Sequence, residues 1–180
     1  MTQFRDEPMP TRALSLYSPW AWAVLNLGKD IENRKWQRWS GDAKFRGWFW
    51  LHASMFGGET PGGLRKLVDE FEGVKVMAER AGRAMPCTPV TPRMFLNMRG
   101  HIVGRARIVD VVERSDSGWF CGPLGLVLAD ATALAEPVPC KGALGFWTVP
   151  GEALARCQRF IRREPNDPEI PDSSGKAVEP

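Results

Sequence analysis

The stretch Gly-Lys-Asp-Ile-Glu-Asn-Arg at residues 28–34 decides how the rest of this chain is organised. It places a cation, a carboxylate and a second cation, Lys29, Glu32 and Arg34, within a few positions of one another. Residues 29–36 read as a strand, and the side-chain period of two puts Glu32 and Arg34 on the same face. The sequence therefore predicts a strand on which a carboxylate and a guanidinium are neighbours.

The segment before this motif predicts a strand followed by a short helix. Residues 12–17 alternate apolar and polar side chains well enough for a half-buried strand. Ser18 offers a hydroxyl N-cap, Pro19 suits the first helical position, and Gly28 can take the left-handed conformation that ends a helix. Trp20 then lies in the first turn, near the positive end of the helix dipole, where a ligand anion or a stacked base can be held.

Further elements follow along the chain. The strand at 47–53 is apolar on both faces, which indicates a barrel strand or one covered by a helix. Helical spacing of Leu64, Leu67, Val68 and Phe71 predicts a helix within 61–82, and the proline-rich stretch up to residue 100 reads as a loop or insertion. Three more strands are predicted at 101–113, 124–128 and 143–149, and a proline-rich link joins the last two. Gly104 marks a bulge or bend in the first of them. A helix ending near residue 161 follows.

Taken in order, these pieces resemble a known domain. They are the Ser-Pro-Trp-Ala helix start at 18–21, the Gly-x-Lys-x-x-Glu-x-Arg spacing of the motif, the run at 46–54, and two downstream segments at 125–130 and 142–147. This combination resembles the ASCH domain, a member of the PUA-like superfamily. The resemblance covers residues 12–150 apart from an unmatched middle, and it implies an α+β fold, a PUA-like small β-barrel of five to six strands flanked by helices.

The resemblance and the composition together divide the chain into three parts. We expect an N-terminal extension at 1–11, an ASCH/PUA-like domain at 12–163 with an insertion around 57–99, and a disordered acidic tail at 164–180. The tail carries five carboxylates against one lysine, a net charge of −4, so the overall charge of +3 leaves +7 for residues 1–163. A basic body suits a polyanionic partner, because Lys and Arg contacts to phosphate supply most non-specific nucleic-acid affinity.

Composition also bounds the class of protein. With 180 residues, of which 43% are hydrophobic, the chain is the size of one domain with a real core. It has no apolar run near the ~20 residues that span a bilayer and no signal-like apolar segment at its start, so we expect a soluble, cytoplasmic protein. The cysteines, at positions 87, 121, 140 and 157, lack the close spacing of metal or redox motifs. We therefore expect reduced thiols, no metal and no cofactor.

Binding is the function that the residues favour first. Six of the eight tryptophans fall between positions 20 and 50, interleaved with lysines and arginines, which is the composition of a surface for single-stranded nucleic acid. We predict a module that recognises single-stranded RNA or DNA, or a modified nucleoside, and the predicted binding residues are Trp20, Lys29, Glu32, Arg34, Ser18 and His52. The structural alternatives are that Trp48 and Trp50 belong to the core, that Glu32 and Arg34 only lock a strand, and that His52 is a structural histidine.

Catalysis is the alternative that the resemblance implies. Similar domains include small amidohydrolases acting on N4-acetylated cytidine nucleosides, which use a lysine, a threonine three residues on and a distant glutamate, and ASCH proteins that cleave RNA. Lys29 matches that lysine, but Glu32 stands where the threonine would be. A hydrolase acting on N4-acylated cytidines or RNA would use Lys29 and Glu32 as catalytic proton-transfer partners. A third possibility is an adaptor whose basic surface meets an acidic protein.

Overall fold

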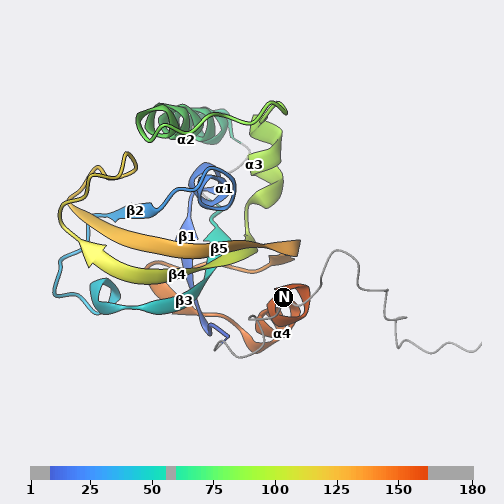
Figure 1. The fold of residues 1–180 in the computed structure, drawn as a ribbon. Coiled ribbons are helices and arrows are strands. Elements are labelled where there is room, and N and C mark those ends of the chain that lie inside the picture. Colours follow the sequence, from blue (N-terminus) through green and yellow to red (C-terminus); the bar gives the residue numbers. More distant parts are fainter. Residues whose placement is uncertain (1–8, 56–59, 162–180) are drawn as a thin grey trace, which may run out of the picture.

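A computed structural model describes residues 9–55 and 60–161 of the chain. Most of the predicted N-terminal extension and the whole predicted tail at 164–180 lie outside the described residues. The described part is an α+β fold in which a curled, half-barrel sheet of six strands is covered by helices (Figure 1). The prediction of five or six strands flanked by helices is confirmed.

The strands of the described part form one sheet in the order β2-β5-β4-β3-β1-β6. Their bounds are β1 Arg12–Leu16, β2 Ile31–Arg34, β3 Gly47–Ala53, β4 His101–Val112, β5 Leu124–Pro139 and β6 Phe146–Thr148. β1 and β3 run parallel, and the other neighbouring pairs are antiparallel. Because β1 lies between β3 and β6, the beginning of the domain is joined directly to its last strand.

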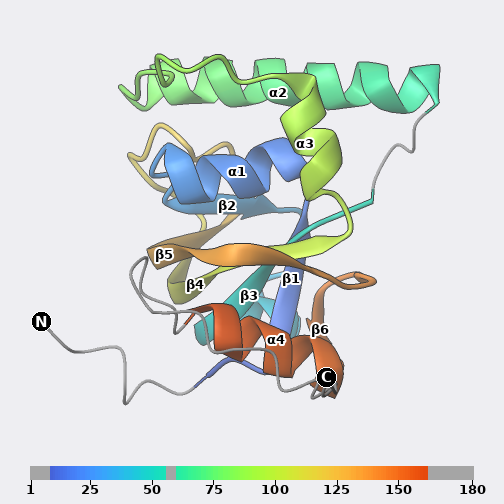
Figure 2. The same cartoon turned by 90° about the vertical axis from the view of Figure 1, so that its right-hand side faces the viewer.

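The helices form layers on both sides of this sheet. Their bounds are α1 Ser18–Asn26, α2 Pro61–Arg80, α3 Pro92–Met98 and α4 Gly151–Ile161, with a 3₁₀ turn, η1, at Asp42–Lys44. Figure 2 shows α1 on one face of the sheet, α2 and α3 stacked over α1, and α4 on the opposite face. None of the helices in residues 9–55 and 60–161 has the length and apolar character needed to cross a membrane.

The end of α1 follows the prediction. Gly28 has a φ of 61°, in the left-handed region, and the Lys29 N–H returns to the carbonyl of Ala23 at 3.2 Å. This turn satisfies a carbonyl at the end of the helix and directs the chain into β2. The helix terminus therefore sets where the charged motif enters the sheet.

β5 corrects the prediction for the second half of the chain. The sequence predicts a strand at 124–128 followed by a proline-rich link, whereas β5 runs without a break to Pro139 and pairs with β4 up to His101. Leu134 and Val138 are buried in this extension, so burial against the neighbouring elements outweighs the low strand propensity of its prolines. The predicted strand at 143–149 is correspondingly shorter, because only β6 pairs with β1.

Gly104 confirms the predicted irregularity in β4. The pairing register shifts here on both sides of β4: one extra β4 residue lies opposite Leu51 and His52 of β3, and the register against β5 shifts between Ile102 and Gly104. A Cβ at position 104 would lie 2.6 Å from the carbonyl oxygen of Thr132, so only glycine allows the backbones to approach this closely. The bulge lets β4 curl with the sheet.

The predicted insertion contains more structure than its sequence indicated. The helix predicted within 61–82 is confirmed as α2, with Leu67 and Phe71 buried, while Leu64 and Val68 are 38% and 40% exposed. The following stretch, predicted as a loop, contains α3. Both helices pack on α1 and on each other, so tertiary burial stabilises a segment whose prolines argued against regular structure.

Three hydrophobic clusters hold these layers together. The first fills the curled sheet beneath α1, the second lies among α1, α2 and α3, and the third lies between the sheet and α4. Trp50 is fully buried in the third cluster and Trp22 in the second, so these tryptophans belong to the core. Trp48 is half-buried, with the guanidinium of Arg105 4.2 Å from its ring centroid. β3 is therefore apolar on both faces because the curled sheet covers one face and α4 the other.

Candidate functional site

A cleft of about 1080 Å³ opens beside the motif at residues 28–34. Its walls come from β1, α1, β2, the end of β3, α2 and the segment at 140–145, which we call the cleft loop. The charged side chains that line it are five cations and two carboxylates: Lys29, Arg34, Lys35, Lys66 and Lys141 against Glu32 and Glu70. The cleft is thus positively charged, and its volume lies just above the ~300–1,000 Å³ typical of ligand sites.

The motif forms one wall of this cleft as a chain of ion pairs. Lys29 is only 3% exposed, and its Nζ donates to the carbonyl of Ile31 (2.5 Å) and to Oε2 of Glu32 (2.6 Å). The other carboxylate oxygen of Glu32, Oε1, lies 3.2 Å from Nη2 of Arg34. Glu32 therefore holds one cation on each oxygen, and the prediction that Glu32 and Arg34 share a face is confirmed.

Arg34 connects the motif to β1. Its Nη2 donates to the carbonyl of Ser15 at 3.1 Å, and its guanidinium lies 5.2 Å from the centroid of Trp36. Lys29 has three N–H donors, of which Ile31 and Glu32 take two, so at most one remains for a ligand. By contrast, Lys35 and Lys141 are exposed at the cleft. The cations best placed to reach a phosphate group therefore lie on the rim and not in the motif.

Trp20 lines the cleft from the first turn of α1. It is half-buried, its Nε1 donates to Oε2 of Glu70 on α2 at 2.6 Å, and Nζ of Lys29 lies 5.7 Å from its ring centroid. Gly73, also on α2, makes room for the indole, since a Cβ there would lie 3.3 Å from the Trp20 ring. The packing of α2 on α1 thus sets the orientation of the ring.

His52 lines the cleft from β3, and both of its ring nitrogens lie at hydrogen-bond distance from a partner. Nε2 lies 3.0 Å from the carbonyl of Cys140, which can only accept, so Nε2 carries the proton. Nδ1, 3.0 Å from Oγ of Ser15, then accepts from the serine hydroxyl when the ring is neutral. Burial lowers the pKa of His52 below its ordinary value of 6.5, while the Cys140 hydrogen bond opposes this shift and the nearby His101 adds to it.

Ser15 is the centre of the network that holds the cleft loop. Besides His52, its Oγ accepts from Nε1 of Trp147 (3.1 Å), and its single proton can go to the carbonyl of Ala143 (3.1 Å) in place of His52. Gly142 packs against the same group, because a Cβ on it would lie 2.8 Å from Ser15 Oγ and would collide with the His52 ring. The cleft loop is therefore fixed to β1 and β3 by neutral hydrogen bonds and close packing.

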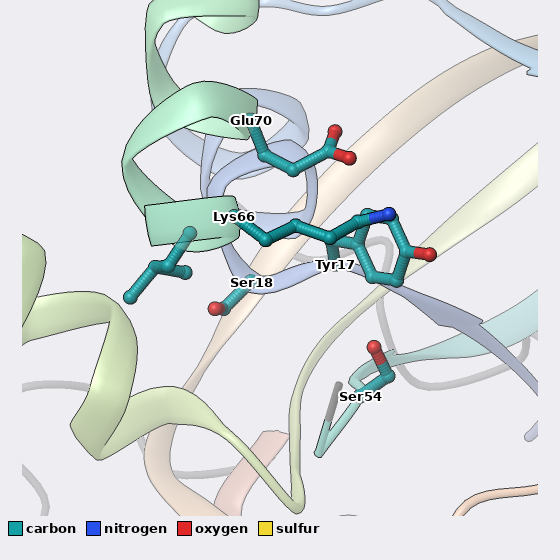
Figure 3. A pocket seen from close by; sticks show the side chains of 6 residues that line it. Tyr17, Ser18, Ser54, Lys66 and Glu70 are labelled. Atoms are coloured by element: carbon teal, nitrogen blue, oxygen red, sulfur yellow. The ribbon is translucent and has the colours of Figure 1, made fainter. Parts of the chain in front are cut away.

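Ser18 does not line the main cleft but a small niche next to it (Figure 3). The predicted N-cap role is wrong, because Tyr17 is the N-cap and its carbonyl accepts from the amides of Trp20 (2.9 Å) and Ala21 (3.0 Å). The backbone closes the first turn by itself, and the Ser18 hydroxyl is buried without a protein partner. Five of the six predicted binding residues thus lie on the cleft, and Ser18 lies beside it.

Sequence reasoning missed Ser15, Glu70 and the cleft loop. Ser15 stands on an alternating strand next to the motif, and a search for polar side chains on that strand would have marked it. Glu70 lies on a helix of the predicted insertion and reaches Trp20 only because α2 packs on α1. Nothing in the local sequence marks either Glu70 or the cleft loop as part of the site.

Side chains of the types that bind metal ions do not cluster in the part of the chain that the structure describes. Within it, no three His, Cys, Asp or Glu side chains lie close enough together to hold a metal ion. Cys87, Cys121, Cys140 and Cys157 are unpaired thiols, and the first two are exposed. Burial raises the pKa of Cys157 to about 12, so this thiol stays protonated at neutral pH.

Comparison with known proteins gives no assignment for this site. A scan against protein-family models matched none of them to this chain, and a search of curated proteins found no match.

Proposed function

We propose that the protein is a nucleic-acid-binding module whose cleft receives single-stranded RNA or a modified nucleotide. The observation that carries this proposal is a positively charged cleft with an oriented tryptophan in its wall. Stacking on an aromatic ring contributes ~1–3 kcal/mol per base, while cations follow the phosphate backbone. The volume of the cleft leaves room for a nucleotide and its neighbouring phosphates.

In this proposal each wall has its own role. A base stacks on Trp20, and the exposed Lys35 and Lys141 contact phosphates. Each oxygen of Glu32 already pairs with a cation but keeps lone-pair capacity, so the carboxylate can accept from an exocyclic amine such as that of cytosine. Lys29 and Arg34 mainly hold Glu32 in place for this contact.

We also propose that the chain is an ASCH-like member of the PUA-like superfamily. The order of its sequence motifs supports this assignment, and so does a curled six-stranded sheet with the motif at the edge of a cleft. An experimental structure whose strand order differs from that of PUA-like barrels would contradict it.

The test of the binding proposal is a titration of tryptophan fluorescence with short single-stranded RNA and DNA at two salt concentrations. We expect saturable quenching that weakens at higher salt, because phosphate contacts release counterions. The variant Trp20→Phe should lose most of the quenching, while fluorescence anisotropy of a labelled oligonucleotide still reports binding. No binding by either readout at low salt would overturn the proposal.

Trp20 is a better probe of the site than Lys29. Replacing Lys29 by Ala would leave Glu32 buried beside a single cation, so a loss of binding could reflect a disturbed fold. The rim variants Lys35→Ala and Lys141→Ala avoid this difficulty because both side chains are exposed. Each is expected to weaken binding to all sequences alike and to reduce its salt dependence.

A hydrolase acting on N4-acylated cytidines or RNA is the second candidate. The observation in its favour is the direct contact of Lys29 with Glu32, 2.6 Å apart in the wall of the cleft, which suits a pair that exchanges a proton. Incubation with N4-acetylcytidine and with RNA, followed by chromatography, tests it. Turnover that Glu32→Gln abolishes, in a variant that melts like the parent, would favour the hydrolase. Absence of product from both substrates would contradict it.

A further inference from the structure

The niche beside the cleft combines two buried hydroxyls that have no protein partner. Ser18, 1% exposed, and Ser54 each have an Oγ that is inaccessible and without a hydrogen-bond partner in the protein. Both line the same niche, with Ser18 at the start of α1 and Ser54 just after β3 (Figure 3). A buried hydroxyl without a partner destabilises the fold, so a pair of them in one place points to a hydrogen-bonding occupant.

The niche adjoins the cleft. Tyr17, Ser54, Lys66 and Glu70 line both of them, so the two hollows share part of their walls. Trp20, the proposed stacking residue, lies in the same first turn of α1 as Ser18, and side chains two positions apart on a helix point in different directions. Its hydrogen-bond partner, Glu70, also borders the niche. Through Glu70, the niche therefore adjoins the proposed stacking position.

Size and charge restrict what the niche accepts. Its volume is about 10 Å³, which fits about one water-sized group and not a phosphate. Its charged lining has one cation, Lys66, and one carboxylate, Glu70, and the Lys66 ammonium lies 5.5 Å from the Tyr17 ring. These two charges balance, so the lining favours neither an anion nor a cation, and it suits a neutral hydroxyl, which both donates and accepts as the two serines do.

We propose that this niche receives the ribose 2′-hydroxyl of a nucleotide stacked on Trp20, and that it makes the cleft prefer RNA to DNA. The 2′-hydroxyl is a small, neutral group that both donates and accepts, and DNA lacks it. This inference rests on the proposed function, because it needs a nucleotide in the cleft. It adds the residues that select the sugar, Ser18 and Ser54.

The experiment compares matched single-stranded oligonucleotides of one sequence, with ribose and with deoxyribose (uracil in both), by fluorescence anisotropy. The unaltered protein should bind the ribose form about three- to tenfold more tightly, the size of one or two hydrogen bonds. Ser18→Ala and Ser54→Ala should each bring this ratio towards one. Ser40→Ala, which removes a serine hydroxyl outside the cleft and the niche, should leave the ratio unchanged.

The outcomes separate the inference from the function on which it rests. If both oligonucleotides bind equally well to the unaltered protein, the niche does not select the sugar and only this inference falls. A ribose preference that survives in both serine variants also overturns it. If neither oligonucleotide binds, the proposed function fails together with the inference. Ser18→Ala and Ser54→Ala remove unpartnered hydroxyls, so thermal melting should show no loss of stability in either.

Discussion

Two walls of the cleft, the motif at 28–34 and the cleft loop at 140–145, are held in different ways. The motif depends on buried charges that are neighbours in sequence, with Lys29, Glu32 and Arg34 paired along one short strand. The cleft loop depends on neutral hydrogen bonds to Ser15 and His52, which lie far from it in sequence. The motif should therefore lose stability when one of its charges loses its partner. The cleft loop should lose stability when its packing or the protonation of the His52 ring changes.

The largest expected loss of stability comes from a substitution in the motif at 28–34. Glu32→Ala leaves the ammonium of Lys29, whose side chain is 1% exposed, without its carboxylate. Breaking a buried ion pair from one side costs about 3–5 kcal/mol, because the remaining charge stays desolvated. Urea unfolding should show a loss of this size. The double variant Lys29→Met/Glu32→Leu should recover part of this loss, because it removes the unpaired buried ammonium while Arg34 still lacks its carboxylate.

An exposed ion pair provides the matched control. Arg38 and Glu113 lie 2.7 Å apart with side chains that are 61% and 56% exposed. Glu113→Ala should cost less than ~1 kcal/mol, since solvent screens such pairs. Equal losses in Glu32→Ala and Glu113→Ala would show that the motif wall is not held by buried charge.

A smaller effect is expected in the cleft loop, which is held partly by close packing against Ser15 and His52. Gly142→Ala places a Cβ against Ser15 and the His52 ring, so the cleft loop must shift, at a cost of about 1–3 kcal/mol. Gly41→Ala is the control, because nothing lies within 4 Å of a Cβ at that position. Thermal unfolding should separate the two variants. Similar melting temperatures would mean that the loop is not packed on His52 as described.

The smallest expected effect is a pH dependence of the free energy of unfolding, caused by His52, which holds the cleft loop. Burial lowers its pKa in the folded state, so the unfolded state binds the proton more readily. The free energy of unfolding should therefore fall as the pH drops below about 6.5, until the pH reaches the folded-state pKa. Urea unfolding from pH 7.5 to 5 should show this slope, and His52→Gln should reduce it. An unchanged slope in that variant would assign the dependence to other groups.

The sequence predicted best what depends on neighbouring residues. The strand and helix before the motif, the left-handed turn at Gly28 and the shared face of Glu32 and Arg34 all follow from local rules. The N-cap at Ser18 failed because the Tyr17 carbonyl already closes the turn. The proline-rich part of β5 and the helix α3 were missed because burial against distant elements outweighs local propensity there.

By itself, then, the sequence determined a charged motif at the junction of a helix and a strand, since short-range backbone geometry decides which of those side chains meet. Only the tertiary structure decided that Glu70 orients Trp20, that Ser15 and His52 hold the cleft loop, and that two serines share a niche. Each of these contacts joins residues that are distant in sequence. Their meeting depends on how α2 packs on α1 and how the sheet curls, which no local pattern encodes.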